Sequence, residues 1–290
     1  MRAYRWLAAE LILLGGVVAT TAVLGPLVTG KLRYHTSATT LNQVMGGDAA
    51  ALLVVAPFCV VVGILALRGH PAAPVLALAP GVFTVYTYTQ LVVGEEYLRL
   101  PGNNERFFPL LYSGFLLGGA TAITGWNAVD ADRLPVMSRA LQRLAAGVLF
   151  AVVVFLVGQH VPSFLDALRD TPTRVEYVSS PTPFWLVKLM DLGIVVPASI
   201  VTGIGVVRGG AWAGRLVYAI VGAYALIGAS VAGMGITMYV NDDPDASLAV
   251  AAGFTLFALV FAALAVVLYR PLFDSVWVHP RPVQAPAVRV

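Results

Sequence analysis

Four ionisable residues lie inside long apolar stretches of this sequence, where a charged side chain needs a physical reason. They are Glu10, Asp48, Lys188 and Asp191. A charge in the middle of a membrane span costs at least about 2.5–3.5 kcal/mol on insertion scales. Lys188 and Asp191 are three residues apart and share one helix face, so they can neutralise each other. Glu10 lies close to Arg5 and is interpreted as an interfacial residue paired with it.

Asp48, Lys188 and Asp191 are open to three interpretations. They form an interhelical salt bridge that only fixes packing, or they line a polar cavity and contact a solute, an ion or a proton. In the third interpretation, Lys188 snorkels to the outer headgroups. The cavity is the interpretation that gives these residues a function, and we predict it for the outer half of the bundle.

Hydroxyl, amide and carboxylate side chains also gather where the third apolar stretch ends. Tyr86, Tyr88 and Gln90 lie within the stretch, and Glu95 and Glu96 follow it. An interfacial aromatic belt explains such residues near a membrane surface, but these tyrosines lie deeper, so we predict that they line the cavity. The two glutamates are expected to gather cations at its outer mouth. The predicted solute- or ion-binding residues are therefore Asp48, Lys188, Asp191, Tyr86, Tyr88, Gln90, Glu95 and Glu96.

Other kinds of site have no support in the sequence. Cys59 is the single cysteine, which excludes an internal disulfide and a CxxC redox centre. The four histidines have no metal-ligand spacing, and His160 at the outer end of the fifth stretch is interpreted as interfacial. The sequence has no basic cluster, so it does not predict nucleic-acid binding. We therefore expect no catalytic set, no metal and no cofactor.

The composition identifies the solvent in which these residues must work. The 290 residues are 59% hydrophobic and 11% charged, and the mean hydropathy is +0.83. Soluble domains carry about 25% charged residues. Eight apolar stretches approach or exceed the ~20 residues that cross a bilayer. The predicted spans are 6–29, 41–67, 72–93, 108–128, 140–161, 184–207, 212–239 and 247–269.

The distribution of charge predicts the orientation of these spans. With the N-terminus inside, the inner segments hold most of the Lys and Arg residues, whereas most acidic residues lie outside. An even number of spans returns the C-terminus to the same side. We predict a multi-pass protein of the cell (plasma) membrane with both termini cytoplasmic.

An internal repeat is visible around the second and sixth spans. Asp48, Pro57, Gly63, Arg68 and Gly69 recur in the same order as Asp191, Pro197, Gly203, Arg208 and Gly209. From the proline onward the offset is 140, and upstream it is 143, which requires a three-residue insertion or deletion between the aspartate and the proline.

This repeat predicts an all-α protein made of two parallel four-helix units, 1–138 and 139–275, followed by a short cytoplasmic tail, 276–290. A pseudo-two-fold axis along the membrane normal would relate the units, with Asp48 and Asp191 as equivalents facing it.

Three functions fit these observations. We favour a transporter or channel for a small solute or ion. The alternatives are a membrane-embedded enzyme or a protein that handles a quinone or lipid, and an accessory subunit of a larger membrane complex. The expected partners are the lipid bilayer, a small solute or ion, and a membrane protein or a second copy of this chain.

Overall fold

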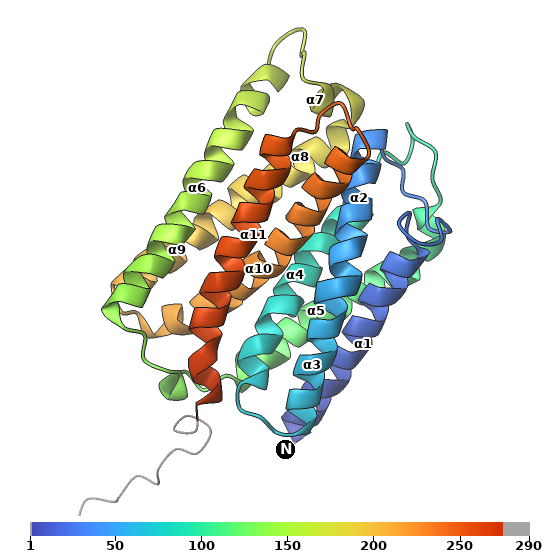
Figure 1. The fold of residues 1–290 in the computed structure, drawn as a ribbon. Helices are drawn as coiled ribbons and strands as arrows, with labels where there is room; N and C mark the ends of the chain where they lie inside the picture. The colour runs from blue at the N-terminus through green and yellow to red at the C-terminus, as the bar shows by residue number, and fades with distance from the viewer. Residues whose placement is uncertain (1, 275–290) are drawn as a thin grey trace, which may run out of the picture.

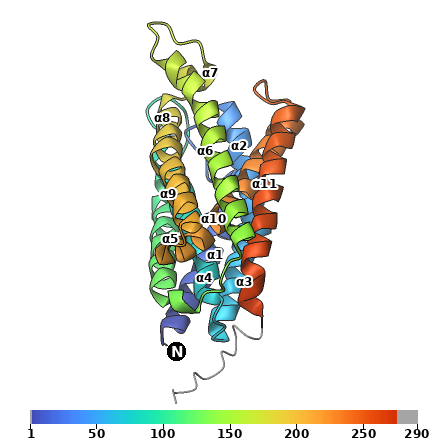
Figure 2. The same cartoon turned by 90° about the vertical axis from the view of Figure 1, so that its left-hand side faces the viewer.

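Long apolar runs form helices in this structure because a helix satisfies its own backbone hydrogen bonds where no water is present. The computed structural model describes residues 2–274, apart from the side chain of Asp132 (Figures 1 and 2). Within that part of the chain, eight helices are long and apolar enough to cross a membrane. They are α1 (Arg2–Leu24), α2–η1–α3 (Ala38–Leu67), α4 (Ala73–Val93), η2–α5 (Asn104–Ala128), α6 (Arg139–Ala167), α8–η4–α9 (Pro181–Val207), α10 (Ala211–Val240) and α11–η5 (Leu248–Phe273).

The eight predicted spans are confirmed, with shifts at their ends. The largest shift is in α6, which was expected to end at residue 161 and continues to Ala167. The helix passes through Pro162, and the Ser163 hydroxyl donates a hydrogen bond to the carbonyl oxygen of His160 over 3.1 Å. The predicted tail, 276–290, lies outside the described residues.

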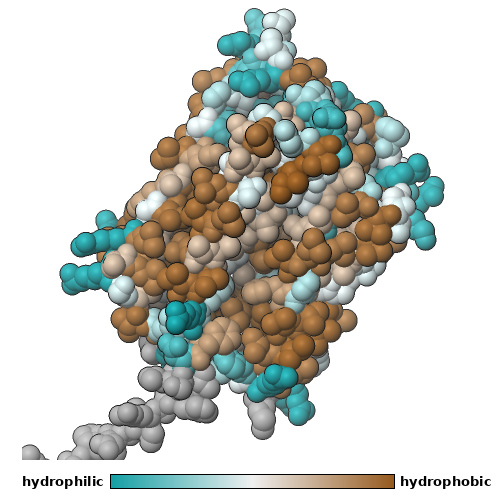
Figure 3. All heavy atoms as spheres, in the orientation of Figure 1, coloured by the Kyte–Doolittle hydropathy of each residue, from teal (hydrophilic) through white to brown (hydrophobic). Residues whose placement is uncertain are grey.

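The outer surface of the bundle is apolar, as a hydrocarbon solvent requires. Leu53, Val154 and Leu256 are more than 60% exposed, although each lies well inside a helix. Figure 3 shows hydrophobic residues over most of one face and hydrophilic residues gathered toward its ends. The chain is therefore an integral, multi-pass membrane protein that meets the lipid bilayer directly.

Two spans contain a widened turn at the same place. One is η1 (Ala51–Val55), between α2 (Ala38–Ala50) and α3 (Ala56–Leu67). The other is η4 (Asp191–Val195), between α8 (Pro181–Met190) and α9 (Val196–Val207). Both are π-helical, and each precedes a helix with proline in its first turn. Proline lacks an N–H and clashes with the carbonyl four residues earlier, so the turn before it opens.

The two broken spans also end alike. Gly69 and Gly209 have φ angles of 67° and 71°, and each closes its helix with the same pair of backbone hydrogen bonds. From η1 and η4 to these glycines, corresponding residues are separated by 140 positions. These shared features support the predicted duplication of the four-helix unit.

The structure locates the three-residue difference inside the helix itself. Serine precedes both helices, Ser37 before α2 and Ser180 before α8, but α8 has 10 residues and α2 has 13. Counted from the widened turns, Asp48 therefore corresponds to Lys188, and Ala51 to Asp191. Relative to its π turn, Asp191 lies one helical turn deeper than Asp48, or about 4.5 Å along the axis.

The helices pack around a central pair. In the first unit α1 packs on α3 and α4 on α5, and in the second α6 packs on α9 and α10 on α11. α4 and α10 pack against each other between the units, and α2 crosses to pack on α10. The two units are not packed identically. α1 packs along α5, whereas their counterparts α6 and α11 are not closely packed, and Figure 2 shows them apart at the end remote from the N-terminus.

The crossing of α2 and α10 is a backbone contact that requires glycine on both sides. A Cβ atom added to Gly46 would overlap the backbone of Gly233, and one added to Gly233 would overlap the backbone of Gly46. Small residues at such positions let two helices approach closely, which is how membrane helices gain packing energy.

We expect Gly46→Ala and Gly233→Ala to lower the free energy of unfolding by about 1–3 kcal/mol, because the helices must separate. Thermal unfolding of the purified protein in detergent measures the effect. Gly16→Ala is the matched control, since nothing lies within 4 Å of a Cβ at that helical position. Equal melting temperatures for the control and the two variants would contradict the close crossing.

Candidate functional site

Asp191 is the centre of a buried hydrogen-bonded cluster that joins three spans. Its Oδ1 accepts a hydrogen bond from the Tyr86 hydroxyl of α4 over 2.6 Å. Its Oδ2 lies 2.7 Å from Nε2 of His160 on α6. His160 is 5% exposed and Asp191 is 9% exposed. A carboxylate so far from water needs such partners on both oxygens, and here they come from helices that are distant in the sequence.

His160 was interpreted as an interfacial residue, and that interpretation is wrong. The continuation of α6 to Ala167 carries His160 below the end of the helix and into the protein. The predicted span ended at residue 161, next to His160, whereas the helix continues through Pro162 to Ala167.

Lys188 does not form the ion pair with Asp191 that their spacing allows. Its ammonium nitrogen lies 3.3 Å from the centroid of the Phe184 ring, one turn earlier in the same helix. Among the described residues, no carboxylate oxygen lies within 4.0 Å of that nitrogen. Lys188 is 6% exposed, so it is buried over an aromatic face instead of reaching the headgroups.

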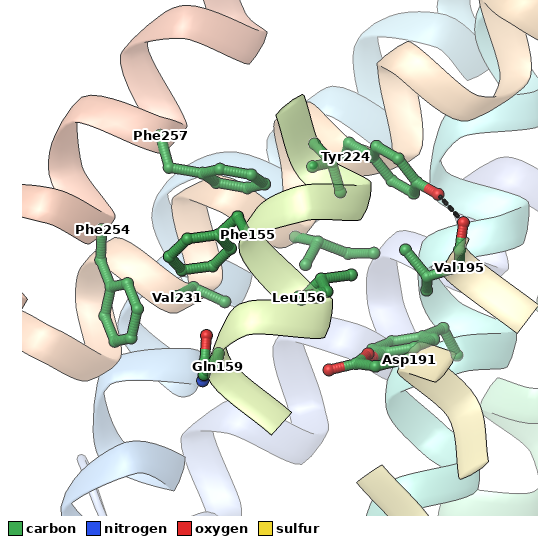
Figure 4. Close-up of a pocket in the computed structure, with 12 residues that line it drawn as sticks. Phe155, Leu156, Gln159, Asp191, Val195, Tyr224, Val231, Phe254 and Phe257 are labelled. Atoms are coloured by element: carbon green, nitrogen blue, oxygen red, sulfur yellow. Dashed lines mark hydrogen bonds between the residues drawn. The ribbon is translucent and has the colours of Figure 1, made fainter. Parts of the chain in front are cut away.

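A cavity of about 120 Å³ lies beside Asp191 (Figure 4). Its polar groups are Tyr86, Gln159, Asp191 and Tyr224, and its other lining residues are Val152, Phe155, Leu156, Val195, Ile227, Val231, Phe254 and Phe257. The Tyr224 hydroxyl donates to the carbonyl oxygen of Val195 over 3.1 Å and lies 2.9 Å from Oγ of Ser199. We call this space the Asp191 cavity.

A second cavity, of about 110 Å³, lies beside Asp48, and we call it the Asp48 cavity. Hydroxyl and amide groups dominate its polar lining: Thr21, Thr40, Gln43, Thr87, Tyr88, Gln90 and Ser230. The Tyr88 hydroxyl donates to Oγ1 of Thr21 over 3.0 Å. Asp48 is 7% exposed, and its Oδ2 has no hydrogen-bond partner among the described residues.

The helices α4 and α10 form the wall between the two cavities. On α4, Tyr86 lines the Asp191 cavity, and Tyr88 and Gln90 line the Asp48 cavity. On α10, Tyr224 lines the Asp191 cavity and Ser230 lines the Asp48 cavity. The structure thus places Asp48 and Asp191 in different cavities, and Lys188 lines neither of them.

Glu95 and Glu96 hold loops together and do not form an open mouth. Glu96 is 3% exposed, and its Oε1 accepts a hydrogen bond from the backbone N–H of Thr182 over 2.6 Å, at the start of α8. Glu95 is 6% exposed, and its Oε2 has no hydrogen-bond partner among the described residues. Both side chains are too buried to gather cations from solution.

His35 contacts the same loops, and sequence analysis gave it no role. Its Nδ1 lies 2.6 Å from the carbonyl oxygen of Leu100, and its Nε2 lies 2.9 Å from Oε2 of Glu105. The carbonyl oxygen can only accept, and the protonated imidazole donates to both partners, so these contacts favour the protonated form. Desolvation lowers the pKa of His35, but these hydrogen bonds outweigh it and raise the pKa above its usual value.

Burial raises the pKa of Glu95 to about 8, although the nearby charge of His35 lowers it in part. Both His35 and Glu95 therefore hold a proton more tightly in the folded protein than in the unfolded chain. The stability they contribute is present at low pH and is lost as the pH rises; for Glu95 this loss runs from about 4.5 to about 8.

We expect the wild-type protein to melt at a lower temperature at pH 8.5 than at pH 5.5. Glu95→Gln removes one of the two groups and should reduce this difference while leaving the helical content unchanged. Thermal unfolding followed by circular dichroism at the two pH values measures both effects. An unchanged pH dependence in Glu95→Gln would contradict the proton uptake assigned to Glu95.

Comparisons with known proteins assign no function to these cavities. No family model, no curated protein and no solved structure matches the chain. The function is therefore inferred from the chemistry of the two cavities themselves.

Proposed function

We propose that this protein transports a small monovalent cation or a proton across the membrane and binds it at Asp48. The observation that carries the proposal is the Asp48 side chain, which lines a cavity from inside a membrane span and whose buried Oδ2 has no hydrogen-bond partner among the described residues. A buried carboxylate oxygen without a donor is costly, and a bound cation or proton removes that cost.

The surroundings of Asp48 suit a singly charged ligand. Hydroxyl and amide oxygens from Thr21, Gln43 and Gln90 lie on the cavity wall, and such oxygens replace the hydration shell of a cation. Within the described residues, no group of three or more His, Cys, Asp or Glu side chains has the arrangement of a metal site. One carboxylate with neutral oxygens favours a monovalent ion over a divalent one.

The opposite end of the bundle is closed by apolar packing. The core that includes Leu7, Leu76, Val217 and Leu268 fills the end that carries the N-terminus. A cation bound at Asp48 can reach that side only if helices move. The widened turns η1 and η4 are the places where the two broken spans can bend, and the central pair α4–α10 is where two units can rock.

We expect currents in reconstituted proteoliposomes on a solid-supported membrane after a concentration jump of Na⁺, K⁺ or H⁺. Asp48→Asn removes the charge that binds the ion and should reduce the responding current at least about tenfold, the loss expected when a cation loses its charged partner. Asp170→Asn, at an exposed outer-loop position, is the control for the change in net charge and should keep the wild-type current.

Two results would reject the proposal. One is a wild-type protein that carries none of the three ions above the level of empty liposomes. The other is an Asp48→Asn variant that elutes as folded protein from gel filtration and carries the wild-type current.

The Asp191 cavity favours a different function among those predicted, the handling of a lipophilic molecule. Its lining is mostly apolar, and its Asp191 carboxylate already has two hydrogen-bond partners. This evidence does not involve Asp48, so a separate function is proposed for each cavity.

A further inference from the structure

We propose that the Asp191 cavity binds a neutral lipophilic alcohol or phenol that enters sideways from the bilayer between α6 and α11. This assignment goes beyond ion transport and concerns the other cavity. It rests on where the cavity opens, on what lines its body, and on which hydrogen-bonding groups remain free at its polar end.

The cavity opens between two helices that do not pack closely. The space between α6 and α11 is bridged by aromatic side chains, with the Phe155 and Phe257 rings 6.2 Å apart between centroids. Phe155 is 45% exposed. Figure 4 shows Phe155, Phe254 and Phe257 on one side of the cavity and Asp191 on the other. Since both helices are membrane spans, a molecule that enters between them comes from lipid and not from water.

The body of the cavity suits an apolar molecule. Eight of its lining residues have aliphatic or aromatic hydrocarbon side chains, and small-molecule sites are mostly lined in this way. A charged solute that entered here would lose its hydration without compensation. The ligand is therefore neutral along most of its length.

The polar end of the cavity accepts hydrogen bonds more readily than it donates them. The Tyr86 hydroxyl already donates its proton to Asp191, and the Tyr224 hydroxyl already donates its proton to the carbonyl oxygen of Val195. Each carboxylate oxygen of Asp191 has one described partner and further lone pairs. A ligand hydroxyl can donate a hydrogen bond to a free lone pair of Asp191. A carbonyl or phosphate oxygen has no proton to donate and would be repelled by the carboxylate.

Gln159 supplies the one polar group near the mouth. It is exposed on α6 between the aromatic side chains and Asp191 (Figure 4). Its amide has both a donor and an acceptor, so it can bind a second polar group of the ligand. An exposed amide on a lipid-facing stretch is costly unless it has such a partner.

The test uses a long-chain alcohol that carries a photoreactive diazirine, and its methyl ether as the matched probe without a donor. The purified full-length protein in nanodiscs is irradiated with each probe, and labelled residues are found by mass spectrometry. We expect the alcohol to label residues 155–159 and 254–257, and the methyl ether to label them about tenfold less, because it cannot donate to Asp191.

Two variants separate binding at the cavity from contact with annular lipid. Asp191→Asn should reduce labelling by the alcohol toward the level of the ether. Val231→Trp fills the cavity from α10 without touching the Asp191 hydrogen bonds, and it should also abolish the selective labelling. Asp170→Asn, at an exposed loop position, should leave labelling unchanged.

Three results would overturn the proposal. The first is equal labelling by the alcohol and the ether, spread over lipid-facing residues such as Val154 and Leu256. The second is a Val231→Trp variant that is folded by gel filtration and still shows selective labelling at 155–159. The third is stronger labelling by the corresponding long-chain amine, which would assign the site to a cation.

Discussion

A proline inside a membrane span removes one backbone hydrogen bond in a solvent that cannot replace it, and this loss organises both broken helices. The turn before Pro57 and the turn before Pro197 open into π geometry, which changes the direction in which the preceding residues point. Asp191 is the first residue of its widened turn, and Asp48 lies just before the other. Each cavity and its carboxylate therefore lie at a break in a helix.

The spans were predictable because hydrocarbon imposes one simple requirement, a long apolar run, on every one of them. The partners of the polar residues were not, since helical spacing describes only neighbours on one helix. Helical spacing predicted that Lys188 and Asp191 pair with each other. In the structure the Lys188 ammonium lies over an aromatic ring, and Asp191 contacts a tyrosine and a histidine from other spans. The residues around Asp48 and Asp191 were found by their cost of burial, but their division into two cavities depends on the α4–α10 wall.

The two predicted four-helix units differ in their packing. In the first, α1 packs against α5, and half of the residues that line the cavity beside Asp48 are polar. In the second, α6 stays away from α11, and the cavity beside Asp191 is lined by phenylalanines. The shorter α8 adds to this difference by placing Asp191 one turn deeper. The two halves of the chain therefore hold cavities of different chemistry.

The glycine crossing of α2 and α10 has a mechanical consequence. Backbone atoms in direct contact cannot slide past one another as long side chains can, so Gly46 and Gly233 pin α2 to α10. Any rocking motion about the central pair would then carry α2 along with α10, although α2 belongs to the other unit by sequence. In such a motion α2 would move together with the second unit and not with α3. The bend in the span would then fall at η1, beside Asp48.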